Sequence, residues 1–220
     1  MRATDTPLLA DRARALKLTP VSRETAARLD QFVDVLLRWQ QRTNLIAAST
    51  IPALWTRHIA DSLQLLDLAP NARTWVDLGS GAGFPGLVLA CALAESPGAE
   101  VHLVESNAKK AAFLREASRL IGAPALVHAV RIEDFVQTFA AAPDTVTARA
   151  LAPLKALFGL AYPLLAKGAL GVFSKGQDVE IELSQATRYW KFEASLAPSR
   201  TSPQGRIVVV RGLERRDTSR

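Results

Sequence analysis

The chain has 220 residues, of which 49% are hydrophobic and 22% are charged, a composition that fits one folded domain with an appended segment and excludes a disordered or fibrous protein. Its formal net charge of +6 favours a polyanionic partner such as nucleic acid. No apolar run approaches the roughly 20 residues needed to cross a bilayer, and the first residues lack a stretch of signal-peptide length, so we expect a cytoplasmic protein without a membrane partner.

The first third of the chain predicts two helices. One follows Thr19-Pro20 or Ser22 and places its apolar residues on a single face, namely Leu29, Phe32, Val33, Leu36 and Leu37. Thr43-Asn44-Leu45 predicts a break, after which Thr50 is expected to cap a second helix. The apolar positions of that second helix are Leu54, Trp55, Ile59, Leu63 and Leu66. We therefore expect an N-terminal helical extension over residues 1–72.

A glycine-rich turn follows at Asp77–Gly86, between the apolar runs at 74–76 and 87–90. A strand that ends in such a turn and continues as a helix brings bare backbone close to a ligand, because glycine has no side chain and tolerates positive φ. Gly81, Gly83 and Gly86 fit the G-x-G-x-x-G fingerprint of dinucleotide-binding proteins. The turn therefore predicts a nucleotide-like cofactor.

A second glycine pattern favours one cofactor over the other. Gly79, Gly81 and Gly83 form a G-x-G-x-G series with Asp77 two residues upstream. A pyrophosphate would be repelled by the Asp77 carboxylate, whereas the ammonium and sulfonium of S-adenosylmethionine would be attracted. We therefore expect S-adenosylmethionine, with Asp77, Gly79, Gly81 and Gly83 at its binding site.

The rest of the chain alternates short apolar runs with helical patterns. Strands are predicted over 75–78, 101–105, 125–130, 145–149 and 169–174, with helices over 86–94, 108–121, 133–140 and 153–166. A helix over 178–186 then precedes two strands, over 190–196 and 207–210, which no helix separates. The alternation predicts a parallel sheet with helices on both faces, and the last two strands predict an antiparallel hairpin. This is the Rossmann-like α/β layout of class I S-adenosylmethionine-dependent methyltransferases, here over residues 73–213 with a basic tail at 214–220.

Ligands of such sheets bind beyond the carboxyl ends of the strands. Glu105 ends the second strand and is expected to accept hydrogen bonds from ribose hydroxyls. Glu133-Asp134 follows the third strand and suits the adenine amine, while backbone around Ile132 suits the ring nitrogens. The alternative for these acids is a favourable interaction with a helix N-terminus alone.

Arg149 and Lys175 end the fourth and fifth strands. Two cations beside a cationic cofactor cost electrostatic energy unless an anion also enters, and an RNA phosphate supplies one. We expect both residues to position the substrate, with surface salt bridges as the alternative. Arg149→Ala, treated as loss of a surface cation, should weaken methyl transfer more than folding.

The acceptor atom is suggested by what the fourth strand end lacks. Amino-group methyltransferases commonly carry Asn or Asp, Pro, Pro and an aromatic residue there, whereas this chain has Thr147-Ala148-Arg149-Ala150. The single cysteine, Cys91, excludes paired cysteines for attack on a pyrimidine. Guanine N7 remains, an atom that carries no proton, so we expect direct in-line transfer that depends on proximity rather than on a general base.

The chain resembles the bacterial small-subunit ribosomal RNA guanine-N7 methyltransferase G family, also called the glucose-inhibited division protein B family. The resemblance rests on ordered motifs, which are Trp39…Asn44-Leu45, Arg57-His58…Asp61-Ser62, Asp77–Gly86, Glu105-Ser106…Lys109-Lys110…Phe113-Leu114, Arg149-Ala150 and Lys175-Gly176-Gln177. It departs at Ile46, where Thr is frequent, and at Gln40, where Asn is. It implies methylation of a guanine in the decoding-centre loop of 16S rRNA, on the free RNA or the 30S subunit.

The resemblance also implies cofactor contacts at matching positions, which are Gly79, Phe84, Ile132, Glu133 and Arg149. Arg57, His58 and Asp61 are expected either to close the cofactor cleft or to meet RNA, with interdomain packing as the alternative. The three histidines lack metal-ligand spacing, so we expect no metal. We expect a monomer. Two other functions stay open, a nicotinamide-dependent oxidoreductase and a noncatalytic RNA-binding protein with a nucleoside pocket.

Overall fold

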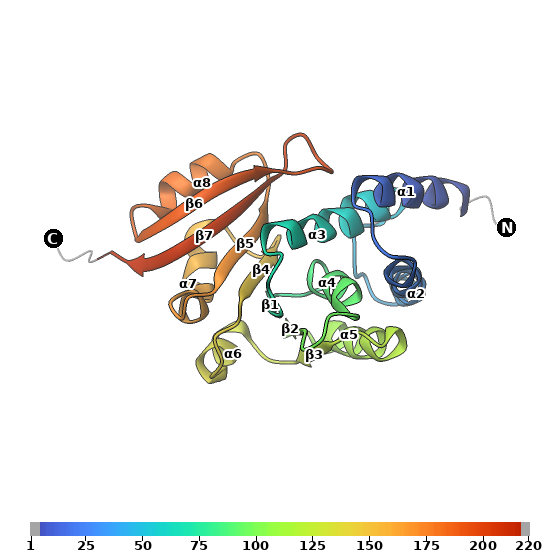
Figure 1. Cartoon of the computed structure of the whole chain (residues 1–220), viewed down its shortest axis with the longest axis horizontal. Helices are drawn as coiled ribbons and strands as arrows, with labels where there is room; N and C mark the ends of the chain where they lie inside the picture. The colour runs from blue at the N-terminus through green and yellow to red at the C-terminus, as the bar shows by residue number, and fades with distance from the viewer. Residues whose placement is uncertain (1–4, 217–220) are drawn as a thin grey trace.

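The computed structural model describes residues 5–216 and contains a seven-stranded sheet of order β3-β2-β1-β4-β5-β7-β6 (Figure 1). Neighbours from β3 to β5 pair in parallel, whereas β7 pairs antiparallel with both β5 and β6. The strands are β1 (Thr74–Leu78), β2 (Glu100–Val104), β3 (Ala125–His128), β4 (Thr145–Arg149), β5 (Leu170–Lys175), β6 (Trp190–Pro198) and β7 (Arg206–Arg215). The predicted parallel sheet and its antiparallel hairpin are confirmed.

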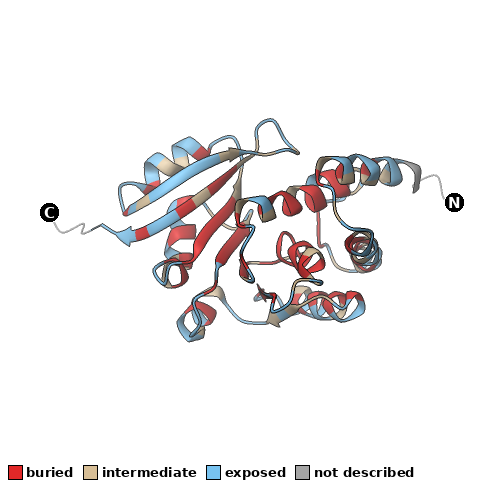
Figure 2. Cartoon of the chain, in the orientation of Figure 1, coloured by how far each residue is buried: buried red, intermediate tan, exposed pale blue. Residues whose placement is uncertain are grey.

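Helices cover both faces of this sheet, because successive side chains of a buried strand point to opposite sides. Trp75 packs into a core with α2, α4 and α5, and its neighbour Val76 packs into a second core with α6, α7 and α8. The helices are α1 (Asp5–Leu18), α2 (Arg23–Gln40), α3 (Asp61–Leu63), α4 (Gly86–Leu93), α5 (Ala108–Ile121), α6 (Ile132–Thr138), α7 (Leu154–Leu165) and α8 (Val179–Ala186). Figure 2 colours most of the central strands and of α4 as buried, and most of β6 as exposed.

Side-chain caps set two helix starts that matter for the site. Of the two predicted starts of α2, Thr19-Pro20 and Ser22, the structure has Ser22 as the cap, and its Oγ accepts from the Thr25 backbone N–H at 3.0 Å. Asn107 begins α5, where its Oδ1 accepts from the backbone N–H groups of Lys109 and Lys110. Each cap satisfies donors that the first helical turn leaves free. The caps therefore fix where α2 and α5 begin beside the glycine turn.

The N-terminal part differs from the prediction in two respects. Helix α1 was not predicted, since its buried positions are Asp11 and the small Ala15 rather than large apolar residues. The predicted second helix is divided into η1 (Ala48–Ala53, a 3₁₀ turn), η2 (Trp55–Ala60, a π turn), α3 and η3 (Gln64–Leu68, a 3₁₀ turn). Thr50 as its cap was wrong, because Thr50 lies inside η1 and its Oγ1 donates to the Ala47 carbonyl at 2.7 Å.

The N-terminal helices share one core with the sheet. The Phe32 ring of α2 lies 5.4 Å from the Phe84 ring and 6.3 Å from the Phe113 ring, measured between centroids. The boundary between 72 and 73 stays a prediction. Of the predicted basic tail, residues 217–220 lie outside the described part, while Glu214 and Arg215 end β7. No helix within residues 5–216 is long and apolar enough to span a membrane.

Candidate functional site

The glycine turn forms a tight loop at the carboxyl end of β1. Gly79, Gly81 and Gly83 have φ of 72°, 55° and 87°, a region that side chains other than glycine rarely adopt. The backbone N–H groups of Gly79 and Ser80 donate to the Val104 carbonyl at 2.9 and 3.0 Å. The loop is therefore fastened to the neighbouring strand β2.

Asp77 lies beneath this loop and is fully buried. Its carboxylate accepts from the Gly86 backbone N–H at 3.1 Å and from the Thr147 hydroxyl at 3.2 Å. Burial raises the pKa of Asp77 to about 6, although these hydrogen bonds act in the opposite direction. In this structure Asp77 holds the loop against β4, and its expected attraction for a cationic cofactor stays a prediction.

The loop leaves backbone accessible at Gly81. A Cβ added there would meet only the Gly79 carbonyl at 3.7 Å, whereas one on Gly79 would lie 2.8 Å from Leu151. The Gly81 N–H donates to Glu105 Oε2 at 2.9 Å, and Glu105 Oε1 accepts from the Asn107 N–H at 2.7 Å. Each carboxylate oxygen has a second lone pair for a further donor. Space is therefore open beside Gly81, whereas Glu105 is buried, and its predicted contact with ribose hydroxyls stays a prediction.

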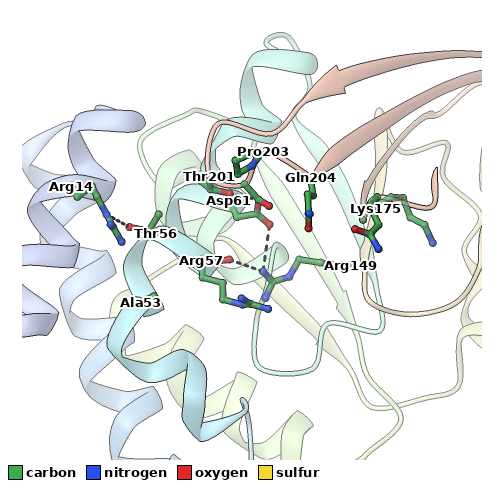
Figure 3. A pocket seen from close by; sticks show the side chains of 14 residues that line it. Arg14, Ala53, Thr56, Arg57, Asp61, Arg149, Lys175, Thr201, Pro203 and Gln204 are labelled. Atoms are coloured by element: carbon green, nitrogen blue, oxygen red, sulfur yellow. Dashed lines mark hydrogen bonds and ion pairs between the residues drawn. The ribbon is translucent and has the colours of Figure 1, made fainter. Parts of the chain in front are cut away.

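Arg149 is the centre of the site, because four groups meet its guanidinium. It donates to His58 Nδ1 at 2.6 Å. It also donates to the Arg57 carbonyl at 3.1 Å and lies 3.5 Å from Asp61 Oδ2 (Figure 3). Its Cζ lies 5.2 Å from the centroid of the Phe84 ring. Only 19% of its side chain is exposed, so the expectation of a surface cation was wrong.

His58 is held neutral between two partners. Its Nδ1 accepts from Arg149, so its Nε2 carries the proton and lies 3.0 Å from Thr50 Oγ1. Burial, Arg149 and Arg57 together lower the pKa of His58 to about 3. The ring stacks on Phe84 with centroids 4.8 Å apart. His58 is therefore a positioning residue for Arg149 and Phe84.

We expect His58 to make folding sensitive to acid. Its folded pKa of about 3 lies below the unfolded value of 6.5, so the unfolded state binds more protons as the pH falls through this window. Stability is retained above about pH 6.5 and falls below it by up to about 1.4 kcal/mol per pH unit. Urea unfolding of the wild type and of His58→Gln between pH 4 and 7 measures the difference.

The comparison with His58→Gln is needed because Asp77 acts in the opposite direction. The folded pKa of Asp77 is about 6, above its usual 3.8, so the folded state gains stability from this group as the pH falls through that range. The wild-type curve alone therefore mixes two effects. Equal pH slopes in the wild type and in His58→Gln would contradict the assignment to His58.

Asp61 ties the N-terminal segment to the loop between β6 and β7. Its Oδ1 accepts from the Thr201 hydroxyl at 2.8 Å, from the Ser199 hydroxyl at 3.3 Å and from the Gln64 amide at 2.9 Å. Its other oxygen faces Arg149. Arg57, His58 and Asp61, which the sequence grouped by motif, thus meet around Arg149.

A cavity of about 620 Å³ opens beside this cluster (Figure 3). Its walls carry the cations Arg14, Arg57, Arg149 and Lys175. Asp61 is the one carboxylate in its lining among the described residues, but Arg14 is also paired with Asp11 and Lys175 with Glu182. Arg57 is exposed and forms no ion pair within residues 5–216, so it is the cation of this cavity that suits an anionic ligand such as a phosphate group.

Lys175, which the sequence predicted to position the substrate, is engaged in contacts within the protein. Its Nζ lies 2.6 Å from Glu182 Oε2 and donates to the Ala152 carbonyl at 3.0 Å. Only 11% of its side chain is exposed. Lys175 therefore joins α8 to the strand end, and its predicted contact with RNA stays a prediction.

Of the predicted cofactor residues, Arg149 lines this cavity, whereas those of the glycine turn, Glu105, Ile132 and Glu133 do not. Ile132 and Glu133 begin α6 and are not among the residues that line it. Glu133 is exposed and lies 3.6 Å from Arg131. Their predicted adenine contacts stay predictions.

Sequence reasoning missed the cavity wall formed by Arg14 and the β6–β7 loop. Arg14 belongs to the unpredicted helix α1, where it donates to the Thr56 hydroxyl at 3.1 Å. The loop residues Thr201 and Gln204 lie in a turn-rich segment that carries no motif. The polar run between the last two strands was the only signal that could have drawn attention to them. Within residues 5–216 no group of three or more His, Cys, Asp or Glu could hold a metal ion.

Comparison with known proteins covers nearly the whole chain. Residues 25–212 match the family described as GidB, rRNA small subunit methyltransferase G. Relatives named ribosomal RNA small subunit methyltransferase G include one from Bradyrhizobium sp. (strain BTAi1), 64% identical over 94% of both chains. A second, from Nitrobacter hamburgensis, is 60% identical over 98% of this chain and 84% of that protein.

Solved structures resemble the fold at low sequence identity. An SAH-bound methyltransferase from Podospora anserina matches with a TM-score of 0.63 and 11% identity over 96% of both chains. An O-methyltransferase from Bacillus cereus in complex with SAH matches with a TM-score of 0.60 and 15% identity over 95% of this chain and all of that one. These likenesses support the methyltransferase layout of the sheet.

Proposed function

Because the chain belongs to the rRNA small subunit methyltransferase G family, we propose that it methylates N7 of a guanine in the decoding-centre loop of 16S rRNA. Methylation of small-subunit rRNA follows from the family itself, and the acceptor atom and the loop are the proposal. The observation that carries it is the cavity whose wall holds the exposed Arg57 beside Arg149, which in turn lies against Phe84 of the glycine turn. An rRNA phosphate supplies the negative charge that this cavity suits.

The cofactor is S-adenosyl-L-methionine, which supplies the methyl group when bound. The loop backbone at Gly79, Gly81 and Gly83 would hold it, with Glu105 accepting from ribose hydroxyls. Phe84 packs under Arg149 and His58, so it forms an apolar wall beside the loop. The open space beside Gly81 supports this assignment, because a side chain there would fill the space that the ligand needs.

His58 and Asp61, the histidine and the carboxylate that contact Arg149, are both engaged in other contacts, which agrees with an acceptor atom that carries no proton. His58 has both ring nitrogens engaged and a pKa of about 3. Asp61 uses its oxygens on Arg149 and on the β6–β7 loop. These residues hold Arg149 in place, so their contribution is orientation of the RNA rather than proton transfer.

We expect the purified protein to transfer label from tritiated S-adenosylmethionine to 30S subunits or to 16S rRNA. Chemical cleavage at N7-methylguanine then locates the modified nucleotide. Label at another atom would contradict the N7 proposal, and tight binding of NAD(H) without a response to S-adenosylhomocysteine would favour the oxidoreductase instead. RNA binding without any transfer of label would indicate a noncatalytic RNA-binding protein.

A further inference from the structure

A second cavity, of about 590 Å³, lies outside the site described above. It forms between the end of α2, the turn that follows, and α5. Its walls include Arg38, Trp39, Arg42, Lys109 and Glu116. The volume is in the range that holds a small ligand the size of a nucleotide.

The three cations in this cavity are available to a ligand. Arg38, Arg42 and Lys109 are exposed, and within residues 5–216 none of them forms an ion pair, unlike Arg28, which pairs with Glu95. Solvated cations that face one another across a cavity repel, and an anion between them removes that cost. The cavity therefore suits a phosphate.

Trp39 adds a flat apolar surface to the same cavity. One edge of its ring packs on Phe113, with centroids 5.8 Å apart, and the residue as a whole is half-buried. Among the described residues the indole N–H has no acceptor, in contrast to that of Trp75, which donates to the Ala72 carbonyl. An aromatic ring beside arginine and lysine is the combination on which unpaired bases stack while their phosphates are held.

The cavity lies at the same edge of the sheet as the glycine loop. Lys109 is in the first turn of α5, four residues after Glu105, whose carboxylate touches Gly81. Side-chain packing also connects the two places, since Trp39 contacts Phe113, and Phe113 and Phe84 both lie against Phe32. One RNA strand can therefore reach both.

We propose that this cavity is a second RNA subsite that holds one unpaired nucleotide flanking the methylated guanine. Arg38, Arg42 and Lys109 bind its phosphate and Trp39 stacks on its base. Glu116 repels phosphate and accepts hydrogen bonds from the exocyclic amine of a base, so it directs the base toward α5. The inference rests on the proposed rRNA substrate and adds where a second nucleotide of it binds.

The test uses the full chain and a fluorescent RNA fragment that contains the decoding-centre loop. The double variant Arg38→Ala/Arg42→Ala should weaken RNA binding about tenfold or more and raise KM, with kcat and S-adenosylhomocysteine affinity unchanged. Because the subsite holds one phosphate, its release should also lower the slope of log K against log salt by up to about 0.7. The matched control is Arg115→Ala/Arg119→Ala, which removes two exposed arginines from α5.

Trp39→Leu tests the base contact, because leucine keeps apolar bulk against Phe113 but offers no ring. We expect RNA binding to fall about fivefold or more, with S-adenosylhomocysteine binding reporting that the fold is intact. Equal RNA affinity in the Arg38/Arg42 variant and the Arg115/Arg119 control would overturn the subsite, and so would unchanged affinity in Trp39→Leu. RNA binding is measured without methyl transfer, so this test does not depend on the proposed reaction. Failure of the proposed reaction would be detected in the separate labelling experiment, in which the wild type would then transfer no label.

Discussion

Replacing Gly86 by alanine is expected to lower the free energy of unfolding by about 2 kcal/mol and to weaken S-adenosylhomocysteine binding. A Cβ at this position would clash with Leu103 Cδ2, and it would lie 2.6 Å from Asp77 Oδ2 and 2.8 Å from Asp77 Cβ. Overpacking of a buried site typically costs about 1–3 kcal/mol. Because Asp77 also accepts from the Gly86 N–H, the clash moves the group that holds the glycine loop.

The affinity for S-adenosylhomocysteine should fall more in Gly86→Ala than the steric clash alone would cause. The loop glycines present their backbone only while Asp77 holds the start of α4 and the end of β1 together. A displacement of about 1 Å there is expected to weaken S-adenosylhomocysteine binding about tenfold or more. Calorimetry measures this binding, and urea unfolding measures the stability.

Gly159→Ala is the matched control, since it makes the same chemical change in α7. A Cβ there would meet only Trp190 Cζ2, at an ordinary 3.9 Å. Alanine favours a helix interior over glycine by about 0.5–1 kcal/mol, so this variant should be slightly more stable than the wild type. Destabilisation of the two variants by the same amount would mean that the crowding at Gly86 has no special effect.

The fold was predictable because its signals are local. Strands β1 and β5 are mostly apolar and mostly buried, β4 is buried although it carries two threonines, and the glycine turn marks the change from strand to helix. Helix α1 gave no such signal, because it packs through Asp11, whose carboxylate accepts from the Thr56 backbone N–H at 3.0 Å. A helix that is held by a polar contact 45 residues away in the sequence has no apolar stripe to detect.

The candidate site was predictable as a set of residues but not as a set of contacts. The motifs predicted Arg57, His58, Asp61 and Arg149 as site residues but not their arrangement. In the structure the other three residues all contact the guanidinium of Arg149. The sequence also predicted Lys175 as a cation that contacts RNA and gave no sign of its ion pair with Glu182, because Glu182 belongs to a helix without a functional motif. Hydrogen bonds and ion pairs between different helices and strands depend on tertiary packing, which the type of a single residue does not reveal.

Arg149→Ala should abolish most methyl transfer, by about a hundredfold or more, because a displaced positioning group costs rate rather than binding alone. It should also cost about 1–3 kcal/mol of stability, more than loss of a surface cation would. Removing the guanidinium takes one donor from the Arg57 carbonyl, from His58 Nδ1 and from one oxygen of Asp61. Turnover with labelled cofactor and urea unfolding measure the two effects, with exposed Arg115→Ala as the control.

Arg149→Lys separates the two effects, because lysine keeps the charge but not the planar fork that reaches three acceptors at once. We expect it to recover part of the stability and little of the turnover.

Since Arg149 is one cause of the low pKa of His58, the pKa of His58 should rise toward 6.5 in Arg149→Ala, and the acid sensitivity of folding that His58 causes should shrink. A wild-type rate of methyl transfer in Arg149→Ala would contradict the role of Arg149 in the site. An unchanged pKa of His58 in this variant would contradict the effect of Arg149 on that pKa.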